Sequence, residues 1–150
     1  MTATITITNP ILRGMNPDPS WIWDDEFQRI VLVTSTFELV PGLPIYVSED
    51  MTCWKHVSNV VDADLARRLL IPFVDDSGGV YAPTLRRIHG KYVIACTIAR
   101  LDDRRAMEGG CTESELMRFH AAEGNFILEA ESIEGPWHGP FWIEGAEGID

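Results

Sequence analysis

An aspartate between two prolines, Asp18 in Pro17-Asp18-Pro19, is the residue of this chain whose setting best suits catalysis. Pro17 fixes its own φ angle, and Pro19 pushes the residue before it out of the helical region toward an extended conformation. The sequence therefore predicts a stiff backbone that presents one carboxylate just before the apolar run Trp21-Ile22-Trp23. A general base needs such rigid aim at a water molecule. An ordinary proline-rich turn has the same composition, so the segment alone leaves both interpretations open.

The composition limits the class of partner. The chain has 150 residues, the usual size of one domain, and 45% of them are hydrophobic. Its net charge of −11 disfavours nucleic acid and anionic membranes and is compatible with a neutral ligand. No apolar run approaches the roughly 20 residues of a membrane span. Residues 1–8 show no signal peptide, so we expect a cytoplasmic protein.

The cysteines and histidines show no ligand pattern. The three cysteines, Cys53, Cys96 and Cys111, are widely spaced and form no CxxC pair, which favours reduced, structural thiols. The four histidines also lack the spacing of a metal site. We therefore expect neither a metal ion nor another cofactor.

Short β-branched and aromatic runs dominate the chain and predict an all-β fold. The expected strands cover residues 1–8, 21–23, 29–37, 45–48, 54–57, 84–88, 91–98, 125–130 and 137–143. Helical turns are expected at 62–70 and at 112–119, the latter within an otherwise irregular charged segment, 101–124.

These strands repeat as two sets of four. Pro19-Ser20 opens the first set, and Pro83-Thr84 opens the second. Four strands per unit at a fixed period are typical of propeller blades. We expect blade one at about 15–62, blade two at about 80–145 and the start of a third at 148–150. The five tryptophans are expected to pack between blades.

Several stretches resemble a known family. They are NPILRGMNPDPS (9–20), TSTFELVPGLPIYVSEDMTCW (34–54), SGGVYAPTLRRIHGKYVIACT (77–97), GNFILEAESIEGPW (124–137) and GID (148–150). Together they are similar to the N-terminal half of glycoside hydrolase family 43, the five-bladed β-propeller β-xylosidases and α-L-arabinofuranosidases. The stretch TSTFELVPGLPIY most resembles the β-xylosidase branch.

The resemblance implies roles for four residues. Asp18 matches the general base of an inverting hydrolysis, and Asp150 matches the aspartate that tunes the pKa of the general acid. Phe37 and Tyr81 match aromatic positions that line the sugar pocket, although the family usually has tryptophan at the position of Tyr81. The implied substrates are xylo-oligosaccharides or arabinosyl side chains.

The family's general acid, a glutamate beyond the midpoint of the propeller, has no counterpart in this sequence. Inverting hydrolysis needs two carboxyl groups about 6.5–9.5 Å apart, so we expect the chain to be inactive alone. Two blades also leave open sheet faces, which predicts self-association or a missing C-terminal half that covers them. The alternative function is a non-catalytic half-propeller that acts as a carbohydrate-binding or assembly module.

Overall fold

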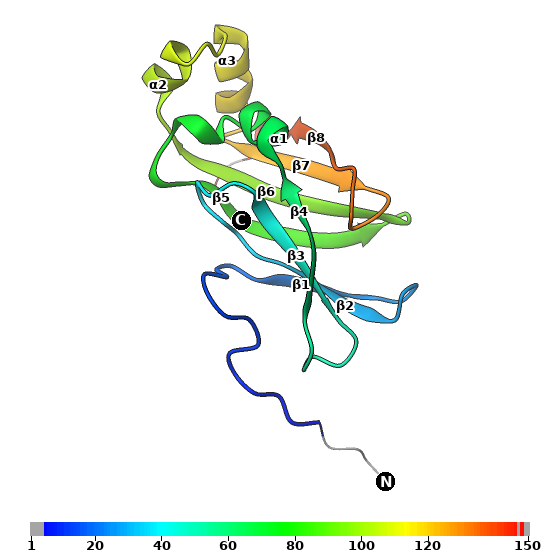
Figure 1. Ribbon diagram of the computed structural model, residues 1–150. Helices are drawn as coiled ribbons and strands as arrows, with labels where there is room; N and C mark the ends of the chain where they lie inside the picture. The colour runs from blue at the N-terminus through cyan, green and yellow to red at the C-terminus, as the bar shows by residue number, and fades with distance from the viewer. Residues whose placement is uncertain (1–4, 147, 149–150) are drawn as a thin grey trace.

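The computed structural model describes residues 5–146 and residue 148 (Figure 1). This part of the chain forms two four-stranded antiparallel sheets, ordered β1-β2-β3-β4 and β5-β6-β7-β8. The first sheet holds β1 (Ser20–Asp24), β2 (Arg29–Val33), β3 (Gly42–Ser48) and β4 (Lys55–Val61). The second holds β5 (Val74–Ile88), β6 (Lys91–Leu101), β7 (Asn125–Ala130) and β8 (His138–Trp142). The predicted all-β fold with two four-stranded units is confirmed.

The first strands of the two sheets lie against each other and run in the same direction. The hydroxyl of Ser20, at the start of β1, accepts a 3.0 Å hydrogen bond from the backbone N–H of Leu85 in β5. Asp24, at the end of β1, bonds Arg87, two residues further along β5. Adjacent propeller blades have this arrangement of inner strands, so the chain is part of a propeller.

The hydrophobic core lies between the two sheets. Alternate residues of β2 and β6 supply it, among them Val31, Val33, Tyr92 and Ile94, all almost fully buried. This alternation follows from the period of two in a strand that has one face on the core.

Two helical segments join the strands. The turn expected after blade one is α1 (Ala63–Arg68), where Asp62 caps the N-terminus by accepting a hydrogen bond from Leu65. A 3₁₀ turn, η1 (Ile71–Phe73), leads from it into β5.

The charged segment 101–124 is more regular than its composition indicates. It forms α2 (Asp103–Glu108) and α3 (Glu113–Ala121). Thr112 and Glu115 form a capping box at the start of α3, and His120 joins Asp103 at 2.9 Å. The helical turn expected at 112–119 is therefore confirmed as α3, whereas the first half of the segment, expected to be irregular, contains α2.

Two expectations are wrong. Of the strand expected at residues 1–8, residues 1–4 lie outside the described part of the chain. Residues 5–8 form no strand, because the alternation of Thr and Ile finds no neighbouring strand with which to pair. Trp21 and Trp23 do not pack between the two blades; they are 59% and 44% exposed. Both lie on the face of β1 opposite Ile22, which packs on the core.

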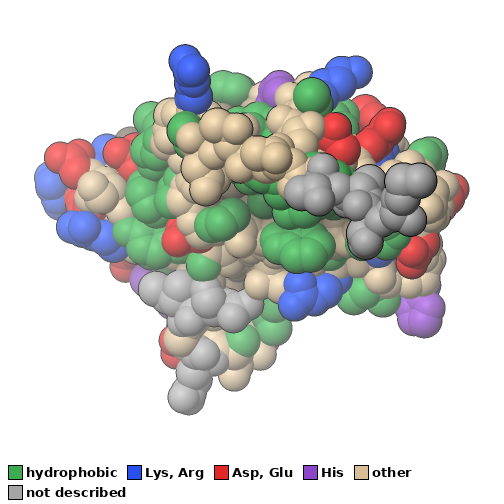
Figure 2. Space-filling view, turned by 90° about the horizontal axis from the view of Figure 1, so that it is seen from below, with side chains coloured by type: hydrophobic (Ala, Val, Ile, Leu, Met, Phe, Trp, Pro, Cys, Tyr) green, Lys and Arg blue, Asp and Glu red, His purple; other side chains and the backbone are tan. Residues whose placement is uncertain are grey.

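The open face of blade one is therefore apolar. Trp21 pairs with Leu32, and Leu32 pairs with Tyr46, so the three side chains share this face. Figure 2 shows hydrophobic side chains gathered over the middle of the surface that is turned downward in Figure 1, where blade one lies.

Candidate active site

Asp18 lies two residues before β1, the innermost strand of blade one, and its side chain is exposed. Its φ angle is +50°, so the expected extended conformation is wrong. Aspartate tolerates the left-handed region better than most residues, yet such backbone costs free energy and persists where the surroundings hold it. The carboxylate is thus presented by a strained, fixed backbone.

Ser35 is the residue that holds Asp18, and the sequence analysis did not identify it. Its hydroxyl donates a 2.5 Å hydrogen bond to Oδ2 of Asp18, and its backbone N–H donates a 3.0 Å bond to the carbonyl of Pro17. Ser35 is fully buried just after β2. The hairpin register could have revealed it, because Ser20 pairs with Val33, and extending that pairing by two residues places Asp18 opposite Ser35.

Phe37 and Tyr81 meet at the same end of the inner strands. Their ring centroids are 5.1 Å apart with an interplanar angle of 63°, an edge-to-face contact. Phe37 exchanges two backbone hydrogen bonds with Val80, at 3.1 and 3.0 Å. The two aromatic residues predicted to line a sugar pocket are therefore neighbours, one from each blade, and Phe37 follows Ser35 by two residues.

Gly79 makes this contact between the blades possible. Its φ angle is +99°, and a Cβ at this position would lie 2.3 Å from the carbonyl oxygen of Phe37. Only glycine allows the two backbones to approach so closely.

Asp150 lies outside the described residues. The chain leading toward it is attached to blade two by Asn125, whose side-chain amide donates to the carbonyls of Ala146 and Gly148, at 3.1 and 3.0 Å. Thr97 donates a 2.5 Å bond to the same side chain. Tyr81, Thr97 and Asn125 pair in a row across β5, β6 and β7. The candidate aromatic residue Tyr81 therefore lies in the same row as Asn125, which holds Gly148.

A second constellation lies at the opposite end of the inner strands. Asp24, fully buried, accepts hydrogen bonds from Arg87 and from the hydroxyl of Tyr92, and Arg29 lies 3.7 Å away. Burial and then the hydrogen bond to Asp24 raise the pKa of Tyr92 above its ordinary value of about 10. Since all four side chains engage one another between the blades, this network joins the sheets.

Within residues 5–146 and 148, no three His, Cys, Asp or Glu side chains are grouped as a metal site would require. In the same residues, no helix is long and apolar enough to cross a membrane.

Comparison with known proteins identifies a family. The family described as "Glycosyl hydrolases family 43" matches residues 7–150. The chain is 36% identical over 140 residues to a non-reducing end alpha-L-arabinofuranosidase of Bacteroides ovatus, covering 92% of this chain and 22% of that protein. It is 39% identical over 134 residues to a putative beta-xylosidase of Escherichia coli K12, covering 89% of this chain and 22% of that protein.

Solved structures agree. A family 43 protein of Bacillus licheniformis superposes with a TM-score of 0.72 at 28% identity, over 95% of this chain and 25% of that one. The Bacteroides ovatus xyloglucan-locus protein GH43B gives a TM-score of 0.69 at 34% identity, over 91% and 23%. The chain thus spans about a quarter of the length of the relatives that it matches.

Proposed function

Because this chain belongs to glycosyl hydrolases family 43, we propose that it forms part of an inverting glycosidase that acts on xylo-oligosaccharides or arabinosyl side chains. The names of its relatives, an alpha-L-arabinofuranosidase and a putative beta-xylosidase, support this class of pentose-bearing substrate. The expected partner is a small oligosaccharide.

The observation that carries the proposal is the geometry of Asp18. Its exposed carboxylate is reached by water, and the buried hydroxyl of Ser35 fixes Oδ2 at 2.5 Å. In the proposed reaction Asp18 takes a proton from a water molecule as that water attacks the anomeric carbon. Phe37, two residues after Ser35, and Tyr81 are proposed to offer an aromatic surface for the sugar ring.

An inverting hydrolysis also needs a general acid, and a further carboxylate sets the pKa of that acid. Asp150 is proposed to tune the pKa of the general acid, and sequence beyond this chain, or another polypeptide, supplies that acid. Without it the leaving oxygen departs as an alkoxide, which forfeits about 10²–10⁴-fold in rate for an ordinary alcohol. A leaving group that departs as a stable anion avoids most of this loss.

This difference gives the test. The purified chain is assayed on 2,4-dinitrophenyl β-xyloside and α-arabinofuranoside, and on the corresponding phenyl glycosides. The expected inactivity of the chain alone applies to glycosides whose leaving group must be protonated, so we expect no detectable turnover of the phenyl glycosides. A dinitrophenolate leaves without an acid, and we therefore expect slow turnover of at least one dinitrophenyl glycoside. Asp18→Asn should abolish that turnover, whereas Asp25→Asn, an exposed aspartate after β1, should not change it.

Two results contradict the proposal. One is the absence of turnover of both dinitrophenyl glycosides by the folded chain. The other is equal rates for the parent chain and Asp18→Asn, which would show that the hydrolysis does not use this carboxylate.

The apolar open face of blade one favours a second candidate, a non-catalytic module that assembles with another polypeptide or a second copy. Trp21 and Trp23 are both exposed there, and burying two tryptophans is a large gain in free energy. Sedimentation of the chain should then show self-association that Trp21→Ser with Trp23→Ser abolishes. A monomer at all concentrations excludes assembly through a second copy.

A further inference from the structure

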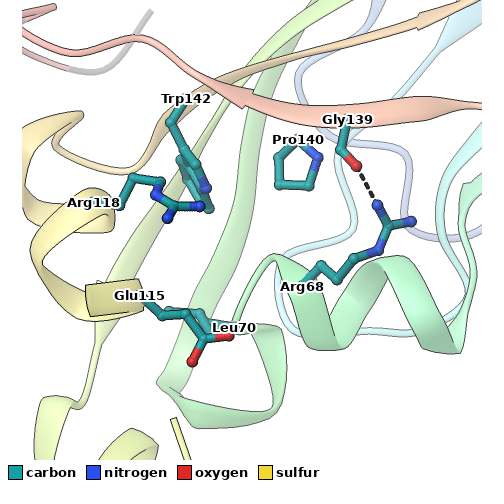
Figure 3. Close-up of a pocket in the computed structure, with 7 residues that line it drawn as sticks. All are labelled: Arg68, Leu70, Glu115, Arg118, Gly139, Pro140 and Trp142. Carbon is teal, nitrogen blue, oxygen red and sulfur yellow. Dashed lines mark hydrogen bonds between the residues drawn. The ribbon is translucent and has the colours of Figure 1, made fainter. Parts of the chain in front are cut away.

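A cavity of about 310 Å³ lies at the outer rim of blade two, between α1, α3 and β8 (Figure 3). Its walls include Arg68, Leu70, Glu115, Arg118, Pro140 and Trp142. The volume is at the lower limit for small-molecule sites, so the cavity suits a ligand of about one ring.

Across the strands, the cavity and the candidate active site lie far apart. Along the strands, they lie at the same end. It borders β8, the last strand in the order β5-β6-β7-β8, whereas Asp18 precedes the innermost strand of blade one. However, Trp142 pairs with Phe126, and Phe126 pairs with Cys96, one residue before the partner of Tyr81. The cavity thus lies at the same end of the strands as the candidate active site.

Arg118 supplies a positive charge that is not held by a direct hydrogen bond or ion pair, although the nearby carboxylate of Glu115 interacts with it electrostatically. In the part of the chain that the structure describes, no hydrogen bond or ion pair engages its guanidinium, and Figure 3 shows it pointing toward the cavity beside Trp142. Arg68, across the cavity, is already held by Asp64 at 3.0 Å and by the carbonyl of Gly139. In a chain of net charge −11, a free guanidinium in a cavity is an unusual feature. Such a fork binds a carboxylate through two parallel hydrogen bonds.

The remaining walls are less favourable for a small inorganic anion than for a larger ligand, because they include a carboxylate and apolar side chains. Glu115, three residues before Arg118 on α3, accepts two hydrogen bonds from Thr112, and these lower the pKa of its carboxyl group below the ordinary value. Both bonds use Oε2, so Oε1 remains as an acceptor for a hydroxyl. Trp142, Pro140 and Leu70 add apolar surface. These walls suit a ligand that combines one carboxylate, at least one hydroxyl and an apolar ring face.

We propose that this cavity binds a uronic acid residue, with its carboxylate on Arg118, a hydroxyl on Glu115 and a C–H face on Trp142 and Pro140. The site lies beyond the proposed hydrolytic function and does not depend on it. An oligosaccharide that carries an acidic sugar would then be held at the rim of blade two as well as near Asp18.

The test titrates the ¹⁵N-labelled full chain with sodium methyl α-glucuronide and follows the indole N–H signals of the five tryptophans, with Trp142 assigned from Trp142→Phe. We expect a saturable shift of the Trp142 signal. The neutral isostere methyl α-glucoside should bind roughly ten- to hundredfold more weakly, since it lacks the charged hydrogen bonds. Sodium acetate and sodium phosphate at equal ionic strength should produce no saturable shift.

Arg118→Gln should weaken glucuronide binding by roughly ten- to hundredfold. Arg104→Gln, on α2 and paired with Glu108 at 3.3 Å, is the matched control and should leave binding unchanged. Both arginines are exposed, so the two variants should fold equally well. Equal binding of glucuronide and glucoside, saturable binding of phosphate, or an unchanged affinity in Arg118→Gln would each overturn the proposal. Because none of these readouts uses hydrolysis, failure here and failure of the proposed glycosidase activity are distinguishable.

Discussion

The hydroxyl of Ser35 donates a 2.5 Å hydrogen bond to Oδ2 of Asp18, joining a fully buried side chain to an exposed one. The backbone N–H of the same serine donates a hydrogen bond to the carbonyl of Pro17. The β1–β2 hairpin therefore fixes the positions of both Ser35 and the segment that carries Asp18. The orientation of the proposed base therefore depends on the end of β2 as much as on the two prolines that flank it.

Replacing Ser35 should test this dependence. Ser35→Ala removes the hydrogen bond that orients Asp18, and we expect turnover of the dinitrophenyl glycoside to fall by about tenfold or more, because a misaligned base loses rate. Ser58→Ala, which removes a 2.6 Å bond from β4 to the carbonyl of Ile133, is the matched control. It should lower the free energy of unfolding without changing turnover of the folded fraction. An equal loss of turnover in both variants would indicate a general effect on stability.

The buried network around Asp24 should be important for stability. Asp24→Asn leaves Arg87 and Arg29 without their buried anion, and we expect a loss of about 3 kcal/mol in the free energy of unfolding, measured by urea denaturation. Glu108→Gln breaks the exposed pair with Arg104 and should cost less than about 0.5 kcal/mol. Similar losses in the two variants would show that the network adds nothing beyond a surface pair.

Tyr92 should make the stability depend on pH in the alkaline range. Its pKa is raised in the native state, mainly by burial, so the folded chain holds the phenolic proton more tightly than the unfolded chain does. This contribution is complete below about pH 10, the ordinary value, and is lost as the pH rises through the native pKa. The free energy of unfolding should therefore decline above about pH 10, and Tyr92→Phe should reduce that decline.

The control for this measurement is Tyr46→Phe, which leaves Tyr92 in place and should keep the alkaline decline. At neutral pH, Tyr92→Phe should itself be less stable, by about 1–3 kcal/mol, because Asp24 loses one of its hydrogen bonds. A decline that is identical in all three proteins would assign the effect to other groups.

Gly79 should tolerate no side chain. In Gly79→Ala the new Cβ would lie 2.3 Å from the Phe37 carbonyl oxygen at a φ of +99°, and we expect a loss of about 2–4 kcal/mol in thermal or urea unfolding. Gly90→Ala has a similar φ of +83° but meets no atom within 4 Å, so it should cost only about 1 kcal/mol of backbone strain. Equal costs would mean that the approach of the two blades is not tight.

Much of the fold was accessible from local pattern. The β-branched runs predict most strands of both sheets, because a strand with one buried face must alternate between apolar and polar residues. Residues 5–8 alternate in the same way but form no strand. A period of two indicates a strand only where a neighbouring strand is available.

The candidate site was predictable only in part. The family resemblance implies roles for Asp18, Phe37 and Tyr81. Ser35 and Gly79 lie in the same resembling stretches without an implied role, and Asp24 lies outside them. The importance of Ser35, Asp24 and Gly79 depends on what lies opposite them: a carboxylate, two arginines and a carbonyl oxygen.

The sequence by itself determined the strands, their grouping into two sets of four and the aspartate between prolines, because each follows from neighbours in the chain. Only the tertiary structure decided which serine orients Asp18, which aromatic rings meet between the blades and which cavity holds an unpaired arginine. These contacts join residues that lie between 17 and 63 positions apart in the chain. Their geometry is set by the register and packing of the two sheets, which no local pattern specifies.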